Sequence, residues 1–128
     1  MADEMPKTGT FCWNELATTD PDKAKKFYTE LLGWTAEDMP MPTGTYTMFK
    51  SGKTSTGGLF KITPEMGNVN PHWMGYIMIE DADEAAKKVE KLGGKVIVPP
   101  MDIPDVGRMV TIIDPTGAAV SMITFQKK

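Results

Sequence analysis

The segment Asp20–Gly33 reads DPDKAKKFYTELLG, and a related segment, DADEAAKKVEKLGG, follows at Asp81–Gly94. Six of the fourteen paired positions carry the same residue, including the first aspartate and the last glycine. Each segment predicts a helix, because the aspartate can cap the N-terminus, the glycine suits a left-handed C-terminal cap, and apolar residues recur at helical spacing. These apolar residues are Ala24, Phe27 and Leu31 in the first segment and Ala85, Val89 and Leu92 in the second. A helix that occurs twice predicts a fold unit that occurs twice.

Strand-like runs flank both helices in the same order. One run precedes each helix: TFCWNELA before the first and WMGYIMIE before the second. The runs that follow are WTAEDM (a weak edge), YTMFK and TGGLFKI in the first half, and KVIV, RMVTII and GAAVSMI in the second. The turn-rich stretches SGKTSTGG and DPTG join consecutive strands as hairpins.

These elements predict an α+β fold of two tandem β-α-β-β-β units that form a curved, partly closed sheet around a pocket. Unit one is expected at about residues 10–62 and unit two at about 72–125, within a single domain of residues 1–128. Residues 63–71, with two prolines, are the expected linker.

Composition excludes several classes of protein. The 128 residues carry a net charge of -3 with acids and bases interspersed, so the charge pattern does not indicate binding of nucleic acid. No apolar run reaches the roughly 18 residues of a membrane span, and the first ten residues do not resemble a signal peptide. The single cysteine, Cys12, has no internal disulfide partner and is expected to be a buried, inert thiol. A reducing cytoplasm fits this cysteine usage.

The 11 methionines allow two interpretations of their role. Methionine fills irregular gaps in a core, and it also lines adaptable binding surfaces. The segment DMPMPTGTY, which contains Met39 and Met41 and is followed by Met48, is expected to be an irregular loop, and these methionines could form a flap beside a pocket.

The motif DPDKAKKFYTELLGW, with its signature of Phe27-Tyr28 and Leu32-Gly33-Trp34, and DPTG before the last strand resemble the vicinal oxygen chelate superfamily. That superfamily includes glyoxalases, extradiol dioxygenases and bleomycin-resistance proteins. The resemblance covers about Phe11 to Phe125 and implies the fold. The first strand, with its Cys-Trp-x-Glu-Leu sequence, is similar to a metal-poor, glyoxalase-related branch.

In glyoxalase-type members, the resemblance implies metal ligands on the first and last strands of each unit, commonly His or Glu. Counting from the shared motifs places these positions at Trp13, Met74, Ser121 and Lys61, with a slip to Phe60 allowed. These side chains cannot form a hard divalent-metal site, since nickel, zinc, iron and manganese prefer imidazole and carboxylate. The sequence therefore predicts no metal and no cofactor.

The only histidine, His72, should share a strand face with Met74. If the two first strands meet antiparallel, Glu15 faces His72, either as an acid–base pair or as a structural pair at a seam. Strand alternation then gives a largely apolar, sulfur-rich pocket wall of Trp13, Glu15, Met74, Tyr76, Met78, Ala119, Ser121 and Ile123. Such a wall suits an apolar or planar ligand.

Charged groups outside this wall give weaker candidates. Lys61 could replace a lost metal charge and hold an anion. Asp102, Asp105 and Arg108 lie in the proline-rich segment PPMDIPDVGRM, expected to be a loop that is either a pocket rim or a solvated turn. SGKTSTGG lacks the spacing of a phosphate-binding loop.

Two functions remain open at this point. The favoured one is a metal-free protein that binds a small apolar or aromatic molecule. The alternative is a divergent lyase, isomerase or dioxygenase, metal-dependent or using Glu15 and His72 as acid and base. A homodimer is an expectation from the resemblance alone.

Overall fold

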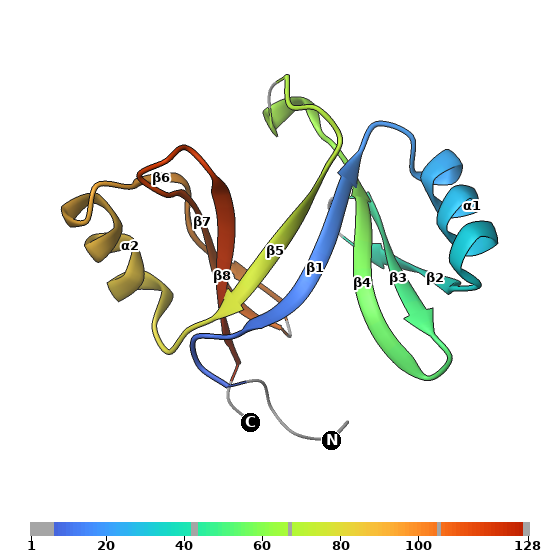
Figure 1. The fold of residues 1–128 in the computed structure, drawn as a ribbon, viewed down its shortest axis with the longest axis horizontal. Helices are drawn as coiled ribbons and strands as arrows, with labels where there is room; N and C mark the ends of the chain where they lie inside the picture. Colours follow the sequence, from blue (N-terminus) through green and yellow to red (C-terminus); the bar gives the residue numbers. More distant parts are fainter. Residues whose placement is uncertain (1–6, 42–43, 67, 105, 127–128) are drawn as a thin grey trace. The chain divides into compact units, whose positions relative to one another are not determined.

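The computed structural model describes residues 7–41, 44–66, 68–104 and 106–126. The order β-α-β-β-β occurs twice along the chain, as the duplicated helix motif predicts, and the fold is α+β (Figure 1). The first set comprises β1 (Phe11–Thr18), α1 (Pro21–Leu32), β2 (Thr35–Met41), β3 (Gly44–Ser51) and β4 (Thr54–Lys61). A short 3-10 turn (Pro64–Met66) precedes the second set: β5 (His72–Met78), α2 (Ala82–Lys91), β6 (Lys95–Ile103), β7 (Gly107–Ile113) and β8 (Ala119–Phe125).

The chain divides into two compact units. The first unit is Trp13–Met74, and the second is Gly75–Lys128 together with the N-terminal segment up to Cys12. Strands of the first unit follow the order β2-β3-β4-β1, and those of the second follow β5-β8-β7-β6. In each unit the first and last strands pair in parallel, β1 with β4 and β5 with β8, and the remaining pairs are antiparallel.

Helix α1 packs on one face of the first unit's sheet. The buried residues there are Leu16, Phe49 and Leu59, against which Tyr28 of α1 and Trp34 pack. Two stacked or tilted ring contacts, Tyr28–Trp34 at 6.0 Å and Trp34–Phe49 at 5.2 Å between centroids, extend this core. The side chains that alternate away from α1 form the opposite face of this sheet.

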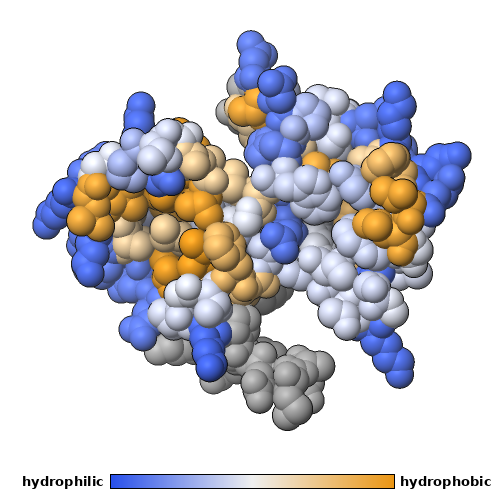
Figure 2. All heavy atoms as spheres, viewed as in Figure 1, coloured by the Kyte–Doolittle hydropathy of each residue, from blue (hydrophilic) through white to orange (hydrophobic). Residues whose placement is uncertain are grey.

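The expected apolar stripe of α1 is partly wrong. Phe27 and Leu31 remain 56% and 63% exposed, while Ala24 and Tyr28 make the contacts with the core. Tyr28, rather than its neighbour Phe27, therefore faces the core of the first unit. Figure 2 shows hydrophobic residues at the surface of both units.

Helix α2 covers one face of the second unit's sheet. Ala82 and Val89 of α2 are buried against Val110 and Ile112 of β7. Asp81 caps the N-terminus of α2 by accepting a hydrogen bond from the backbone N–H of Glu84 at 3.0 Å, as the motif predicts. The left-handed conformation after α2 falls on Gly93 (φ 93°), one residue before the glycine expected to terminate the helix.

Two segments expected to be loops are strands. β2 continues through Asp38 to Met41, and β6 continues through Pro99 and Pro100 to Ile103. Both are the outermost strands of their units' sheets, where a proline without an N–H can be accommodated. Register shifts at Val96/Val98 and Val98/Met101 mark where β6 departs from regular pairing. Asp105, part of the expected loop cluster, lies outside the described residues.

Among the described residues, no helix has both the length and the apolar character that crossing a bilayer requires.

Candidate functional site

A chain of three hydrogen-bonded side chains lies on the face of the first unit's sheet that α1 does not cover. The indole N–H of Trp13 donates to the Tyr46 hydroxyl oxygen at 3.0 Å. The Tyr46 O–H in turn donates to Oε2 of Glu15 at 2.8 Å. All three side chains are half-buried, and the chain of donors, from Trp13 through Tyr46, ends at the carboxylate of Glu15.

Strand alternation explains why these residues meet. Leu16 and Phe49 point toward α1, so Trp13 and Glu15 on β1 and Tyr46 on β3 point to the other side. The strand between them, β4, places Gly58 opposite Glu15 in the register. A Cβ at Gly58 would overlap the Tyr46 hydroxyl, so glycine leaves the space through which Tyr46 reaches Glu15.

The same face carries thioether and aromatic groups. Met39 pairs with Tyr46 across β2 and β3, Met48 pairs with Gly58 and Phe60 pairs with Tyr46 across β3 and β4. Met39, Met48 and Phe60 are half-buried. We call the set Trp13, Glu15, Met39, Tyr46, Met48, Gly58 and Phe60 the β1–β4–β3 face.

The electrostatics of this face centre on one carboxylate. Burial, followed by the neighbouring charge of Glu15, raises the pKa of the Tyr46 hydroxyl far above its ordinary value. Tyr46 therefore stays protonated and acts as a hydrogen-bond donor to Glu15. At the edge of the same face, Lys50 lies 3.6 Å from Glu37, so each of these charges has an opposite charge beside it.

His72 begins β5, and its Nδ1 lies 2.7 Å from the backbone carbonyl oxygen of Asn70. A carbonyl oxygen only accepts, so Nδ1 must carry the proton and Nε2 is the acceptor nitrogen of the neutral ring. The adjacent Trp73 donates through its indole N–H to the Tyr28 hydroxyl at 3.2 Å, on the α1 side. By alternation, His72 and Met74 point away from α1. The facing of Glu15 and His72 stays a prediction.

In the second unit, predicted wall residues lie on the face away from α2. Tyr76 and Ser121 are neighbours in the β5–β8 register and are 6% and 1% exposed. The Tyr76 hydroxyl donates to Sδ of Met109 at 3.9 Å, and the Ser121 and Thr111 hydroxyls lie 2.7 Å apart. Met78, also expected on the wall, is half-buried on β5. Of the other two, Ile123 is buried and Ala119 is exposed.

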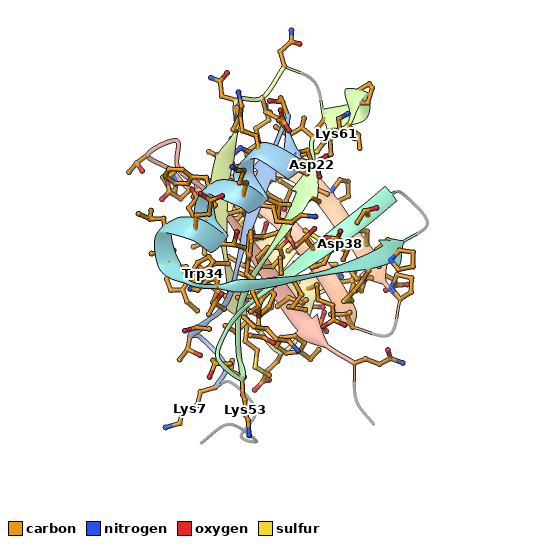
Figure 3. All side chains as sticks on the ribbon, turned by 90° about the vertical axis from the view of Figure 1, so that its right-hand side faces the viewer. Lys7, Asp22, Trp34, Asp38, Lys53 and Lys61 are labelled. Carbon is orange, nitrogen blue, oxygen red and sulfur yellow. The ribbon has the colours of Figure 1, made fainter. Side chains whose placement is uncertain are left out.

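Lys61 lies at the end of β4 and is exposed (Figure 3). It follows Leu59 by two residues and therefore alternates toward the α1 side of the sheet rather than toward Glu15. A role for Lys61 in holding an anion stays a prediction.

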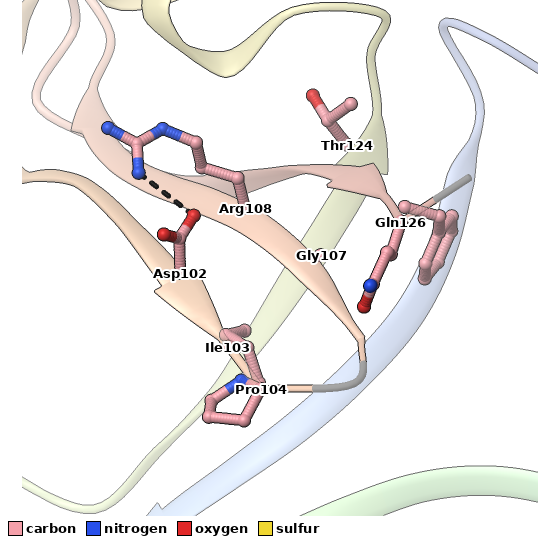
Figure 4. A pocket seen from close by; sticks show the side chains of 8 residues that line it. Asp102, Ile103, Pro104, Gly107, Arg108, Thr124 and Gln126 are labelled. Atoms are coloured by element: carbon pink, nitrogen blue, oxygen red, sulfur yellow. Dashed lines mark hydrogen bonds and ion pairs between the residues drawn. The ribbon is translucent and has the colours of Figure 1, made fainter. Parts of the chain in front are cut away.

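Arg108 and Asp102 lie beside an open cavity of about 470 Å³ in the second unit (Figure 4). The guanidinium donates to Asp83 at 3.0 and 3.1 Å and to Asp102 at 2.9 Å. The paired guanidinium lowers the pKa of the Asp83 carboxyl below its ordinary value. Since two carboxylates already surround Arg108, this cavity offers no strong attraction for an anion.

The side chains that the resemblance places at metal-ligand positions do not fit a metal ion. The Trp13 indole is a donor only and already binds Tyr46, and the Ser121 hydroxyl is buried against Thr111. Met74 offers a thioether, a poor ligand for a hard divalent ion. Within the described part of the chain, no group of three or more His, Cys, Asp or Glu side chains could hold a metal ion.

Cys12 is half-buried, and its thiol lies 3.6 Å from the carbonyl oxygen of Tyr76. Burial raises the pKa of the thiol, which leaves less of the nucleophilic thiolate at neutral pH.

Alternation along the first strand predicted that Trp13 and Glu15 share one face, but the sequence did not predict that Tyr46 and Gly58 lie beside them. The two adjacent glycines in TGGLFKI were the sequence feature that could have indicated this contact, because a glycine inside a strand is typical where another group approaches closely. The identity of that group depends on the β3–β4 register, which alternation within one strand does not provide.

The profile of the Glyoxalase/Bleomycin resistance protein/Dioxygenase superfamily matches residues 10–122. The chain belongs to this superfamily. The match spans both units of the glyoxalase-superfamily fold, from the start of β1 into β8.

Two curated proteins are similar to most of this chain. CFP32 of Mycobacterium tuberculosis, named provisionally as a glyoxylase, is 42% identical over 118 residues, covering 91% of this chain and 44% of CFP32. The anthracycline biosynthesis protein DnrV of Streptomyces peucetius is 33% identical over 127 residues, covering 89% of this chain and 46% of DnrV. The chain thus spans somewhat less than half the length of these relatives.

Solved structures of the superfamily fold match at lower identity. Methylmalonyl-CoA epimerase from Mycobacterium tuberculosis superposes with a TM-score of 0.66 at 12% identity, covering 98% of this chain and 95% of the epimerase. The protein BH1468 from Bacillus halodurans gives a TM-score of 0.68 at 12% identity, covering 95% and 98% of the two chains. At this identity the likeness establishes the fold alone.

Proposed function

We propose that this glyoxalase-superfamily protein binds a small apolar or aromatic molecule, without a metal, on the β1–β4–β3 face. The observation that carries the proposal is the Trp13–Tyr46–Glu15 chain. It puts an indole where a metal-binding relative is expected to carry a ligand, and it ties that indole to a tyrosine. Rigid aromatic groups with a few placed polar atoms are typical of small-molecule sites.

The composition of the face supports the same conclusion. Met39 and Met48 supply flexible thioether side chains, and Phe60 adds an aromatic ring to those of Trp13 and Tyr46. Methionine adapts its shape to a ligand at small cost, and thioethers contact aromatic rings favourably. One carboxylate on this face fixes orientation rather than supplying most of the affinity.

The experiment is calorimetric titration of metal-stripped protein with 1-naphthylmethanol, a neutral aromatic probe. We expect one site per chain, with affinity lowered at least about tenfold in Trp13→Ala, because a large buried ring contributes more than 1.4 kcal/mol. Trp73→Ala is the matched control, since Trp73 contacts Tyr28 on the α1 side of the sheet. Equal weakening by both substitutions, or no binding to the native protein, would contradict the proposal.

A second candidate function is acid–base catalysis by Glu15 and His72. Two observations favour it: Tyr46 orients the Glu15 carboxylate, and the hydrogen bond from Nδ1 to Asn70 leaves Nε2 of His72 as a base. Assays for glyoxalase, epimerase and dioxygenase turnover, run with Glu15→Gln and His72→Ala, separate this function from binding alone. Turnover lost in both variants would favour catalysis, and turnover that neither variant changes would exclude these residues from it.

A further inference from the structure

We propose that the open cavity beside Arg108 is a binding site for a neutral polyol, such as a sugar, whose neighbouring hydroxyl groups pair with the polar side chains that line it. The cavity lies in the second unit, so this inference does not depend on the function proposed for the β1–β4–β3 face. It follows from a buried hydroxyl without a partner, from a donor and an acceptor held side by side, and from the charges around the cavity.

Three polar side chains that line the cavity lie in one row across the sheet. Arg108 on β7 is the register partner of Asp102 on β6 and of Thr124 on β8 (Figure 4). Val110 and Ile112 alternate onto the same face of β7 as Arg108, and they pack against α2. The row therefore lies on the α2 side of the sheet, where Arg108 also reaches the first turn of α2.

Thr124 supplies the buried hydroxyl. Its Oγ1 has no hydrogen-bond partner among the described residues, and no other buried side-chain nitrogen or oxygen of those residues is left in this state. A polar group removed from water without a partner is unfavourable, so such a group calls for a ligand, an ion or an ordered water. Because Thr124 also lines the cavity, a bound molecule can provide the missing partner. A hydroxyl group suits this position, since the threonine hydroxyl both donates and accepts.

Arg108 and Asp102 supply the donor and the acceptor. The guanidinium donates through Nη1 to Asp102 at 2.9 Å and through Nε and Nη2 to Asp83 at 3.0 and 3.1 Å. Within the described part of the chain these bonds use three of its five N–H groups, so two donors remain. Asp102 accepts the Arg108 bond on Oδ1 and is 78% exposed, so its second oxygen can accept another bond. One hydroxyl of a polyol can thus accept from Arg108 while the adjacent hydroxyl donates to Asp102.

The charges around the cavity favour a neutral molecule. Asp83 and Asp102 both pair with Arg108, so two negative groups surround one positive group. The guanidinium lowers the pKa of the Asp83 carboxyl below its ordinary value, so this group stays ionised near neutral pH. An anion would approach both carboxylates, and a cation would compete with Arg108 for them. A neutral polyol meets neither obstacle and still gains hydrogen bonds to charged groups, which are the stronger kind.

The size of the cavity and its other lining residues fit the same class of molecule. A volume of about 470 Å³ is within the range of small-molecule sites. Ile103, Pro104 and Phe125 add apolar surface, which can contact the C–H groups of a sugar ring. Gln126 adds an amide, which can both donate and accept.

The test compares three probes that share a pyranose ring: glucose is neutral, glucosamine is cationic and glucuronate is anionic. Each is titrated at pH 6 into the isotope-labelled full chain, and the shifts of the amide resonances give the dissociation constant. Thr124→Val removes the hydroxyl and keeps the shape of the side chain, and Asp102→Ala removes the acceptor at an exposed position. Thr56→Val is the matched control, because Thr56 is a half-buried threonine on β4 of the first unit.

We expect glucose to shift amide resonances of β6, β7 and β8 around the cavity and to bind more tightly than glucosamine or glucuronate. Its affinity should fall at least about fivefold in Thr124→Val and in Asp102→Ala, since each variant loses one hydrogen bond to the ligand. Thr56→Val should retain the native affinity. Urea denaturation gives a second measurement: Thr124→Val should be at least as stable as the native protein, because it removes a buried hydroxyl without a partner.

Three results would overturn the proposal. If glucose shifts no amide resonance at the cavity, the cavity is not a polyol site. Tighter binding of glucosamine or glucuronate would show that the ligand is charged. Equal glucose affinity in the native protein, Thr124→Val and Asp102→Ala would place the binding elsewhere. The proposed aromatic site of the first unit is tested separately with 1-naphthylmethanol, so the two proposals can fail independently.

Discussion

Gly58 decides at the scale of single residues whether the Trp13–Tyr46–Glu15 chain can form. It has no side chain, and the Tyr46 hydroxyl occupies the space where its Cβ would lie. The same residue is the register partner of Glu15 on one side and of Met48 on the other. A Cβ added to its neighbour Gly57 would likewise lie only 2.7 Å from the backbone carbonyl oxygen of Asn14. Both glycines therefore serve close packing within the sheet.

We predict that Gly58→Ala destabilises the protein by about 1–3 kcal/mol, the usual cost of adding a methyl group to a filled space. Tyr46 would have to move, and its hydrogen bonds to Trp13 and Glu15 would lengthen or break. Urea denaturation of the native protein and the variant measures the change in the free energy of unfolding.

A double-mutant cycle with Tyr46→Ala is the control for this prediction. In that background the space is open, so the cost of Gly58→Ala should fall to a few tenths of a kcal/mol or reverse in sign, since alanine is favoured over glycine within a strand. An unchanged cost would mean that backbone conformation, rather than contact with Tyr46, requires the glycine.

At the scale of elements, Asp38 connects α1, β2 and β3. Its carboxylate on β2 accepts hydrogen bonds from Lys25 of α1 at 2.9 and 3.0 Å and from the Thr47 hydroxyl of β3 at 2.7 Å. Thr47 is only 2% exposed, whereas the Asp38 side chain is 51% exposed. The ion pair should consequently contribute little in water, and the bond to the buried Thr47 should contribute more.

We predict that Asp38→Ala lowers the free energy of unfolding by about 1–3 kcal/mol, because Thr47 loses its acceptor. Asp38→Asn is the matched control: it keeps an acceptor oxygen for Thr47, loses the ion pair, and should cost less than about 1 kcal/mol. Equal losses in the two variants would show that the charge, and not the hydrogen bond to Thr47, is the important part.

The pH dependence of this contact has a definite sign. Lys25 first, then Thr47, lowers the pKa of Asp38 below its ordinary value of 3.8. The charge-dependent stabilisation is therefore complete above the unfolded pKa and is lost as the pH falls through the lower, folded value. The difference in stability between the native protein and Asp38→Asn should accordingly disappear in acid and be constant near neutral pH.

Elements differ in how far local sequence determines them. Both helices begin where the sequence predicts, because the capping aspartates Asp20 and Asp81 act within three residues of themselves. The ends of β2 and β6 were not predictable from their prolines, since tolerance of proline depends on whether a strand lies at a sheet edge. The inward face of α1 was also missed: Phe27 and Tyr28 are adjacent aromatic residues, and packing against Trp34 selects Tyr28.

For the molecule as a whole, the duplicated motif and the superfamily profile agree on the fold. Function depends instead on the side chains at a few positions, which can differ between proteins of the same fold. That Trp13 and Glu15 share one face was predictable from alternation within a single strand. Tyr46 joins them only through the pairing of β1 with β4 and β4 with β3, which brings residue 46 beside residue 15. Such long-range register is a property of the folded sheet and is not encoded in any local pattern.

The last prediction concerns metal binding by the whole chain. Metal-stripped protein titrated calorimetrically with nickel, zinc, manganese and iron(II) should show no stoichiometric binding, because Trp13, Met74 and Ser121 lack the imidazole and carboxylate groups that these ions prefer. His72 alone offers one imidazole nitrogen, and a single such ligand gives weak affinity. His72→Ala is the control for adventitious binding through that nitrogen. One-to-one binding at micromolar affinity that His72→Ala abolishes would place a metal site around His72 and Glu15, and the metal-free proposal would then be wrong.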